Sequence, residues 1–266
     1  MIMDEEEIHP QVKKLLALPQ YEQRSPEWFE QRTKVLTASL IDTVLGRSKY
    51  QTAEEVLFAK CGIKRPFLSN DATRHGQKYE DEAIAHYCKR YNKKNLSFGL
   101  LPHPTIPFLA GSPDDITYDG IVIEVKCPLR RKIVMGEIPH HYLSQILFNM
   151  EICDLEKGVF IEYRPAWMND NDEITLNVVH IDRDREWFKS VYPKLEAFWK
   201  DVCFYRDVGI SYHPQFEYWN HKYGEKNSID IGPPRKKTCL FIEDEEEDEE
   251  EEEIPLEVKS ERRKPR

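Results

Sequence analysis

The sequence lacks several features that would place the protein in a membrane or outside the cell. It contains no run of about 18 apolar residues, the length that a membrane-spanning helix requires. Its acidic start, MIMDEEEIHP, includes no apolar segment of a secretory signal. Its six cysteines are scattered without a Cys-x-x-Cys pair, which argues against zinc and against a disulfide framework. We therefore expect an intracellular protein, cytoplasmic or nuclear, with reduced cysteines and no membrane partner.

The sequence also lacks an excess of positive charge. Its formal net charge of −10 comes mostly from residues 243–253, which hold eleven acidic residues in succession. Residues 1–242 hold 33 Lys and Arg against 35 Asp and Glu, so this part is nearly neutral. Any surface that binds a polyanion must therefore be local. The acidic run and the basic residues after it predict a disordered tail.

The remaining sequence, with 40% hydrophobic residues overall, is sufficient for one core. We divide the chain into a lead-in segment (1–24), one folded domain (25–226) and a disordered acidic and basic C-terminal tail (227–266). Helical and strand patterns alternate, which predicts an α/β fold with a mixed central β-sheet flanked by helices. Two helices are expected to begin at Ser25 and Thr52. Further helices are expected at about 37–46, 71–91 (capped by Asp71), 139–153 and 182–204. Strands are expected at about 114–118, 121–127, 157–163 and 173–181.

A hairpin is predicted where Asp119-Gly120 separates two β-rich runs. A three-residue loop at 118–120, with its glycine in the left-handed conformation, sets Asp114 opposite Glu124, and we favour this register. A two-residue loop would set Asp115 opposite Glu124 instead. The choice of loop therefore decides which aspartate meets the glutamate.

The second strand of this hairpin carries an unusual pair of charged residues. Side chains alternate along a strand, so Glu124 and Lys126 share one face. Ordinary polar residues on a solvent-facing hairpin would give the same pattern, but the apolar residues at 122–125 indicate a buried strand, in which an acid needs a partner. Carboxylates such as Asp114 and Glu124 are the ligands that Mg²⁺ takes, and a nearby lysine can act on a bound water. The hairpin therefore predicts a metal site for phosphodiester hydrolysis.

Five short motifs follow one another in an order that resembles a known family. They are T-A-S at 37–39, H-G-Q-K-Y-E at 75–80, G-S-P-D at 111–114, E-V-K-C-P at 124–128 and Y-L-S-Q at 142–145. Over residues 25 to 206 the chain resembles the lambda-type exonucleases (viral recombinase nucleases) of the PD-(D/E)xK superfamily. The resemblance implies a restriction-endonuclease-like nuclease core.

The resemblance also implies an activity. It is the metal-dependent, 5′-to-3′ hydrolysis of phosphodiester bonds from the ends of double-stranded DNA, leaving 3′ single strands for recombination or repair. The implied cofactor is Mg²⁺, as two ions, with Mn²⁺ as a substitute. The implied partners are double-stranded DNA ends, a single-strand annealing protein and further copies of the chain in a ring trimer.

The resemblance finally implies roles for ten residues in three groups. The metal ligands would be Glu80, Asp114, Glu124 and the Val125 carbonyl. The catalytic residues would be Lys126, Tyr142 and Gln145, together with Asp114 and Glu124. The residues that bind the 5′-phosphate would be Arg32, Ser39 and Ser112.

Spacing alone leaves some of these assignments open. Glu80 shares a helix face with apolar residues, yet a surface acid would fit as well. Tyr142 and Gln145, three residues apart, can face a cleft together or pack as ordinary helix residues. Asp115 stands where the family usually has Gly, so either Asp114 or Asp115 can be the metal ligand.

Two rival functions also remain. One is a PD-(D/E)xK endonuclease or flap-specific nuclease, which would cut closed circular or branched DNA. The other is a DNA-end-binding scaffold without catalysis, against which the presence of Glu80, Asp114, Glu124 and Lys126 argues.

Overall fold

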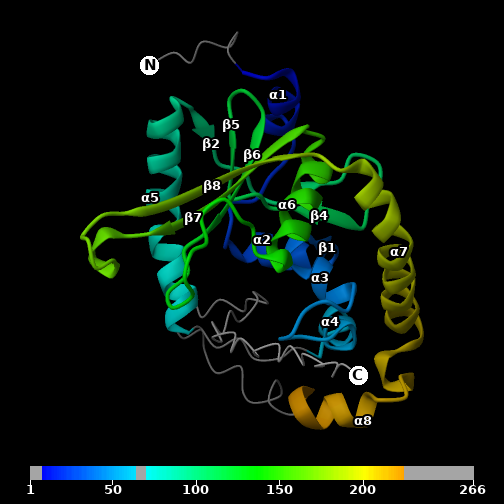
Figure 1. Ribbon diagram of the computed structural model, residues 1–266. Coiled ribbons are helices and arrows are strands. Elements are labelled where there is room, and N and C mark those ends of the chain that lie inside the picture. Colours follow the sequence, from blue (N-terminus) through cyan, green and yellow to red (C-terminus); the bar gives the residue numbers. More distant parts are fainter. Residues whose placement is uncertain (1–7, 64–69, 225–266) are drawn as a thin grey trace, which may run out of the picture.

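The computed structural model describes residues 8–63 and 70–224, and a mixed β-sheet is its central element (Figure 1). The strands of this sheet lie in the order β2 (Asn95–Leu96), β5 (Asp115–Thr117), β6 (Ile121–Lys126), β7 (Lys157–Arg164) and β8 (Thr175–Asp182). β6 and β7 are parallel, and the other neighbours are antiparallel. The predicted α/β fold with a mixed sheet is confirmed, whereas the predicted tail lies outside the described residues.

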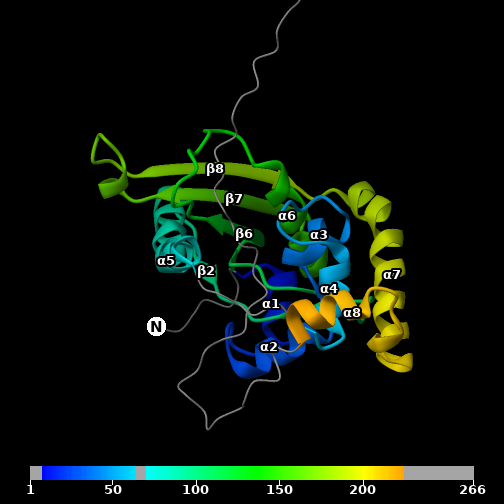
Figure 2. The ribbon, with the colours of Figure 1, turned by 90° about the horizontal axis from the view of Figure 1, so that it is seen from below.

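Two helices cover the opposite faces of β6, namely α5 (Asp71–Tyr91) and α6 (His140–Cys153) (Figure 2). Ile123 and Val125 pack in a buried cluster with α5. Val122 packs in the cluster that contains the apolar residues of α6. The alternation expected along this strand therefore holds, and it leaves Glu124 on the α6 side.

A smaller sheet lies beside α6. Its order is β1 (Leu36–Thr37), β4 (Leu109–Gly111) and β3 (Leu101–Pro102), with β1 parallel and β3 antiparallel to β4. Gly111 allows α6 to come close, because a Cβ at this position would lie 2.6 Å from Oδ1 of Asn149. This contact connects the two sheets through α6.

Short helices connect these strands, and their starts follow the sequence. They are α2 (Pro26–Thr33), a 3-10 turn (Ala38–Leu40), α3 (Ile41–Val44) and α4 (Ala53–Lys60). Ser25 caps α2 by accepting a hydrogen bond from the backbone of Trp28. Thr52 and Glu55 form a reciprocal capping box at the start of α4.

Two sequence predictions about helices need correction. Asn70, not Asp71, caps α5, since its side chain accepts from the backbone N–H of Thr73. The lead-in segment contains a helix, α1 (Pro10–Leu16), which was not predicted. Its buried Val12 and Leu15 belong to the main core. Only a few apolar residues of this short segment are buried, too few for a clear helical period.

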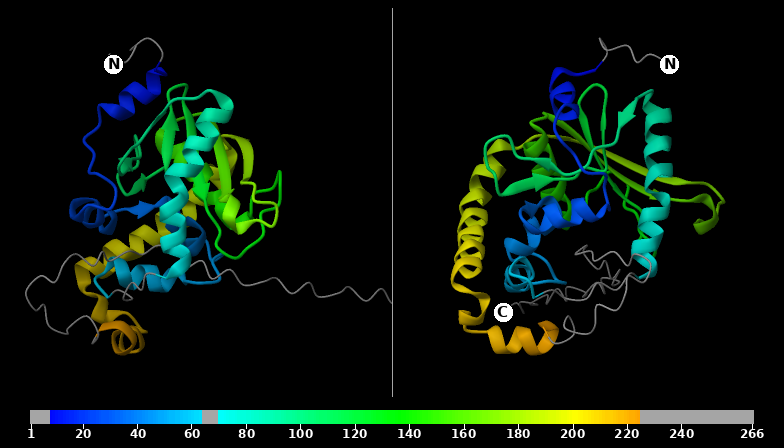
Figure 3. Two further views of the ribbon diagram at one scale, coloured as in Figure 1. Left: turned by 90° about the vertical axis from the view of Figure 1, so that its left-hand side faces the viewer. Right: turned by 180° about the vertical axis from the view of Figure 1, so that it is seen from behind.

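The C-terminal part of the described chain is helical. It contains α7 (Arg185–Val208), a 3-10 turn (Ile210–Tyr212), α8 (Phe216–Trp219) and a π-turn (Asn220–Gly224). Earlier in the chain, a further 3-10 turn (Ala166–Met168) lies between β7 and β8. The long helices α5 and α7 lie on opposite sides of the molecule (Figure 3). No helix among the described residues combines the length and apolar character needed to cross a membrane.

Candidate active site

The hairpin of β5 and β6 places two carboxylates opposite each other. Asp115 pairs with Ile123, so the next position along the ladder sets Asp114 against Glu124. The loop is the three-residue one, with Gly120 at a φ of +84°. This confirms the register favoured from the sequence. In addition, Oδ2 of Asp114 accepts a hydrogen bond of 2.5 Å from the backbone of Val125, which ties the two strands together.

The other aspartate, Asp115, turns to the opposite face of the hairpin. It is 3% exposed and accepts a hydrogen bond of 2.5 Å from Nδ2 of Asn95. Burial raises the pKa of its carboxyl group, with the Asn95 hydrogen bond acting in the opposite direction. Asp115 does not line the cleft that Asp114 lines, so the structure favours Asp114 for any ion bound there.

Glu124 is completely buried. Its Oε2 accepts a hydrogen bond of 3.1 Å from Nδ2 of Asn149, and its Oε1 lies 3.4 Å from the Lys126 ammonium. Burial raises the pKa of Glu124 to about 7. The charge of Lys126 and the hydrogen bonds from Lys126 and Asn149 oppose this rise. Burial and the charge of Glu124 raise the pKa of Asp114. Two carboxylates thus share a site with one lysine.

This donor set fits a hard divalent cation. Oε1 of Glu124 is buried beside the Lys126 ammonium, and burial and the charge of Glu124 disfavour the facing Asp114 as an anion, so a cation between them would stabilise both. Within the described residues, however, no group of three His, Cys, Asp or Glu side chains is close enough to enclose an ion. The pair Asp114 and Glu124 would therefore leave the other coordination positions of an ion to water or to a further group of the cleft.

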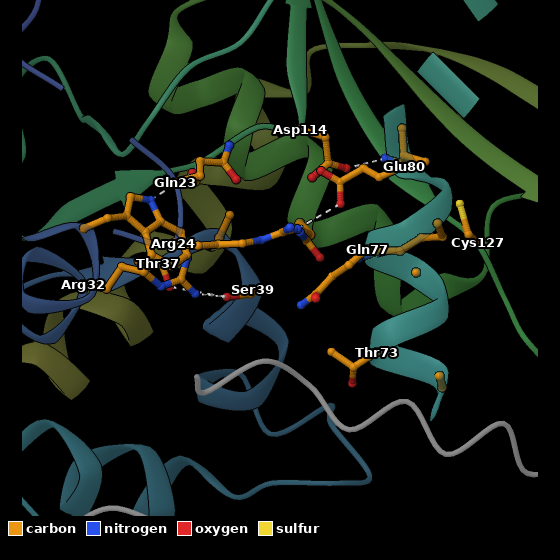
Figure 4. Close-up of a pocket in the computed structure, with 18 of the residues that line it drawn as sticks. Gln23, Arg24, Arg32, Thr37, Ser39, Thr73, Gln77, Glu80, Asp114 and Cys127 are labelled. Carbon is orange, nitrogen blue, oxygen red and sulfur yellow. Dashed lines mark hydrogen bonds and ion pairs between the residues drawn. The ribbon is translucent and has the colours of Figure 1, made fainter. Parts of the chain in front are cut away.

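Glu80 is the candidate for this further group. It lines the same cleft from α5 (Figure 4), and its charge raises the pKa of Glu124, so the two carboxylates act on each other. Its Oε2 lies 3.3 Å from the guanidinium of Arg24, which reaches it from the turn before α2. Glu80 therefore faces the site, which is one of the two positions that its helix spacing left open, and it is paired with Arg24.

Arg32, Ser39 and Ser112 gather on the other side of the cleft. Arg32 donates a hydrogen bond of 3.1 Å to Oγ of Ser39, and its guanidinium lies 4.3 Å from the centre of the Trp28 ring. The Trp28 indole donates to Oγ of Ser112 at 3.3 Å, and Ser112 donates to the carbonyl of Gly99 at 3.1 Å. A stacked, forked guanidinium beside hydroxyl groups is suited to a phosphate.

Helix α6 contributes in two ways. Gln145 lines the cleft, whereas Tyr142 lies behind it, 5% exposed, with the Lys126 ammonium 4.9 Å from its ring centre. Tyr142 is thus placed to orient Lys126 rather than to meet a substrate. Eight of the ten predicted residues line one cleft, and the other two, Glu124 and Tyr142, are in contact with Lys126.

Sequence reasoning missed three residues of this site. Asn149 lies one helical turn after Gln145 and holds Glu124. Arg24 reaches Glu80, and Gln23 donates to the carbonyls of Phe98 and Pro113 at 2.8 and 3.1 Å. A lone asparagine in the apolar run ILFNMEIC was a usable signal for Asn149. Nothing in the local sequence identified the other two.

Comparison with known proteins finds a family model that matches a part of the chain containing most of the residues that line the cleft. Residues 27–156 match the family described as the YqaJ-like viral recombinase domain. An uncharacterised protein of Acanthamoeba polyphaga mimivirus is 33% identical over 162 residues, which amount to 54% of this chain and 30% of that protein. The match therefore covers less than a third of the viral relative's length. All ten predicted residues lie within 27–156.

Solved structures show the same fold. The crystal structure of LHK-Exo in complex with dAMP has a TM-score of 0.57 and 23% identity, and covers 77% of this chain and 100% of its own. A crystal structure titled as an alkaline exonuclease (LHK-Exo) from Laribacter hongkongensis gives 0.56 and 22% over the same shares. The resemblance to lambda-type exonucleases and the restriction-endonuclease-like core predicted from the sequence are confirmed.

Proposed function

Because residues 27–156 form a YqaJ-like viral recombinase domain, we propose that the chain is a metal-dependent 5′-to-3′ exonuclease of double-stranded DNA. It hydrolyses phosphodiester bonds from DNA ends and leaves 3′ single strands for recombination or repair. The observation that carries the proposal is a single cleft, which contains Asp114 and Lys126 on one side and Arg32 with Ser39 on the other. One side suits phosphodiester hydrolysis, and the other suits a terminal phosphate.

The hydrolytic side of the cleft has residues for a metal and for water. Asp114, Glu124, Glu80 and the Val125 carbonyl would hold Mg²⁺, as two ions, or Mn²⁺ in its place. Such an ion, when bound, lowers the pKa of a water molecule and stabilises charge on the phosphate. Lys126 lies 3.4 Å from Glu124, from where its ammonium orients the attacking water and donates to a phosphate oxygen.

The chemistry of the step explains the use of a phosphate pocket. Water attacks the phosphorus and gives up a proton to solvent, the bond from phosphorus to the 3′ oxygen of the terminal nucleotide breaks, and that oxygen takes up a proton from solvent. The products are a 5′-mononucleotide and a strand that again begins with a 5′-phosphate. Arg32, Ser39 and Ser112 therefore meet the same group after every cycle, which gives the enzyme its direction. The dAMP bound to LHK-Exo is a nucleotide of this kind.

The experiment that tests the proposal uses a linear, 5′-phosphorylated duplex with Mg²⁺. The wild-type protein should release mononucleotides, and Lys126→Ala should lose this activity by a factor of roughly 100 or more. Lys189→Ala, at an exposed position of α7, is the matched control and should keep it. Equal product from wild type and Lys126→Ala would refute the site, and no product from either would favour a DNA-end-binding scaffold.

Closed circular DNA separates the exonuclease from its nearest rival. An exonuclease leaves the circle intact, because no end can enter the pocket of Arg32 and Ser39. A PD-(D/E)xK endonuclease would nick it, and a flap-specific nuclease would cut branched duplexes in preference to blunt ends. Nicking at the rate of end digestion would overturn the proposed direction.

Partners follow from the product of the reaction. A 3′ single strand needs a single-strand annealing protein, and processive digestion favours a ring of copies, such as a trimer, around the duplex. We place the activity in the cytoplasm or nucleus of a cell in which viral DNA recombines.

A further inference from the structure

The turn before α2 holds Arg24 in an unusual backbone conformation. The backbone N–H of Ser25 donates to the carbonyl of Glu22 at 3.1 Å, and Arg24 within this turn has a φ of +67°. This left-handed region favours glycine. Gln23 fixes the turn to the loop before Asp114, with bonds to Phe98 and Pro113. The chain thus keeps an arginine where glycine would be easier, a pattern that marks functional sites.

The side chain of Arg24 uses this position to cross the cleft. It extends from the side of Arg32 and Ser39 toward Glu80, below Asp114 (Figure 4). Its guanidinium is 3.3 Å from Oε2 of Glu80, and the two side chains are 39% and 25% exposed. An ion pair this open to water stabilises a fold little, so stability does not explain the strained turn.

We propose that Arg24 is a catalytic residue that binds the scissile phosphate after exchanging its partner Glu80 for it. The proposal rests on the proposed function, in which Glu80 is a metal ligand. A carboxylate oxygen that takes a divalent cation cannot also accept from Arg24, and two cations repel each other at this distance. The released guanidinium then lies beside the next anion in the cleft, which is the phosphodiester to be cut.

Arg24 and Arg32 thereby bind two different phosphates. Arg32 is fixed by its stacking on Trp28 and its bond to Ser39, so it suits the terminal 5′-phosphate, which must return to one place in each cycle. Arg24 is more exposed and is held by the Glu80 pair, so it suits a phosphate that gains charge during the reaction. Loss of either arginine should therefore leave a different kinetic signature.

The test uses Arg24→Gly, because glycine accepts the left-handed turn and this variant should fold at least as well as wild type. Its kcat on linear duplex should fall about 100-fold. The ratio of rates on 5′-phosphorylated and 5′-hydroxyl ends should stay as in wild type, whereas Arg32→Ala should lower that ratio. Arg24→Lys, which keeps the charge but not the fork, should recover part of kcat. Arg90→Ala, at an exposed position of α5, is the control.

Two binding measurements complete the test. In a calorimetric titration without DNA, Mn²⁺ should bind Arg24→Gly at least as tightly as it binds the wild-type protein. The reason is that the Arg24 guanidinium, which competes with the ion for Glu80, is absent from this variant. Duplex anisotropy with Ca²⁺ in place of Mg²⁺ should show weaker DNA binding by Arg24→Gly. Wild-type kcat and wild-type DNA binding in this variant would overturn the proposal and leave Arg24 as a partner of Glu80 only. An inactive wild-type protein would instead refute the proposed function, and the Ca²⁺ measurement would still decide whether Arg24 binds DNA.

Discussion

Nδ2 of Asn149 donates a hydrogen bond of 3.1 Å to Oε2 of Glu124, and thereby fixes a fully buried carboxylate from the opposite element, α6. The other oxygen of Glu124 faces Lys126. Asn149 is 0% exposed and does not line the cleft, so it cannot touch a substrate there. It is a positioning residue for the carboxylate.

Asn149→Ala should weaken metal binding and activity together. The carboxylate of Glu124 would lose the donor that orients it, and loss of such a supporting bond costs roughly 10- to 100-fold in metal affinity or activity. Mn²⁺ calorimetry and exonuclease rates check this, with Asn171→Ala in the exposed turn before β8 as the control. The preference for 5′-phosphorylated ends should not change. A variant that lost activity but bound Mn²⁺ normally would contradict this role.

The stability of the metal-free protein should depend on Glu124. Its pKa in the fold is about 7, raised mainly by burial from 4.5, so the folded state binds the proton more tightly than the unfolded chain does. The contribution of Glu124 to the free energy of unfolding should therefore fall as pH rises from about 4.5 to about 7. Thermal melts in EDTA across this range measure it.

Glu124→Gln is the matched variant for these melts. Its side chain cannot ionise, so its melting temperature in EDTA should exceed that of wild type at pH 8 and should vary less with pH. Mg²⁺ should raise the melting temperature of wild type at pH 8 more than that of the variant. A wild-type protein that gains stability relative to Glu124→Gln in EDTA as pH rises through this window would show that Glu124 is not held protonated.

The two neighbouring aspartates should respond differently to the same change. Asp114→Asn should abolish Mn²⁺-dependent hydrolysis and lower Mn²⁺ affinity, because Asp114 faces Glu124 in the cleft. Asp115→Asn should keep both, since Asp115 is bound to Asn95 on the other face and its pKa is already raised by burial. Calorimetry on both variants decides between the two acids. The reverse pattern would assign the ion to Asp115.

Removal of the terminal phosphate pocket should be visible as lost selectivity. Arg32→Ala should reduce the ratio of rates on 5′-phosphorylated and 5′-hydroxyl duplex roughly 10-fold or more, because a charge-assisted pair with the phosphate is lost. Ser39→Ala should act in the same direction but less strongly, since a hydroxyl offers the phosphate a neutral hydrogen bond and no charge. Competition between the two labelled duplexes in one reaction measures the ratio. An unchanged ratio in Arg32→Ala would remove the 5′-phosphate from this pocket.

The hairpin could be predicted from the sequence because its determinants are local. Gly120 can adopt a positive φ without strain, and the alternation from Val122 to Lys126 assigns each side chain to a face. The resemblance to the lambda-type exonucleases then assigned Glu80, Arg32 and Ser39 to the same site. The features of the hairpin itself can be read within a few residues of one another.

What could not be predicted depends on contacts across long distances in the sequence. Arg24 meets Glu80 56 residues away, and Asn149 meets Glu124 25 residues away. The cap of α5 also moved from Asp71 to Asn70, since both residue types favour that position and only the backbone decides between them. Spacing shows that Tyr142 and Gln145 share a side of α6, but not that one lines the cleft and the other lies behind Lys126.

Gly111, at the end of β4, is a position where the single methyl group of an alanine should disturb the site. A Cβ there would lie 2.6 Å from Oδ1 of Asn149 and 3.2 Å from the side chain of Ile152, so the Asn149 side chain or α6 as a whole would have to shift away from β4. That shift would carry Asn149 away from Glu124 while every residue of the cleft stayed chemically intact. Gly111→Ala should therefore lower the proposed activity while keeping every proposed catalytic side chain, and we expect such a variant to bind DNA ends without digesting them.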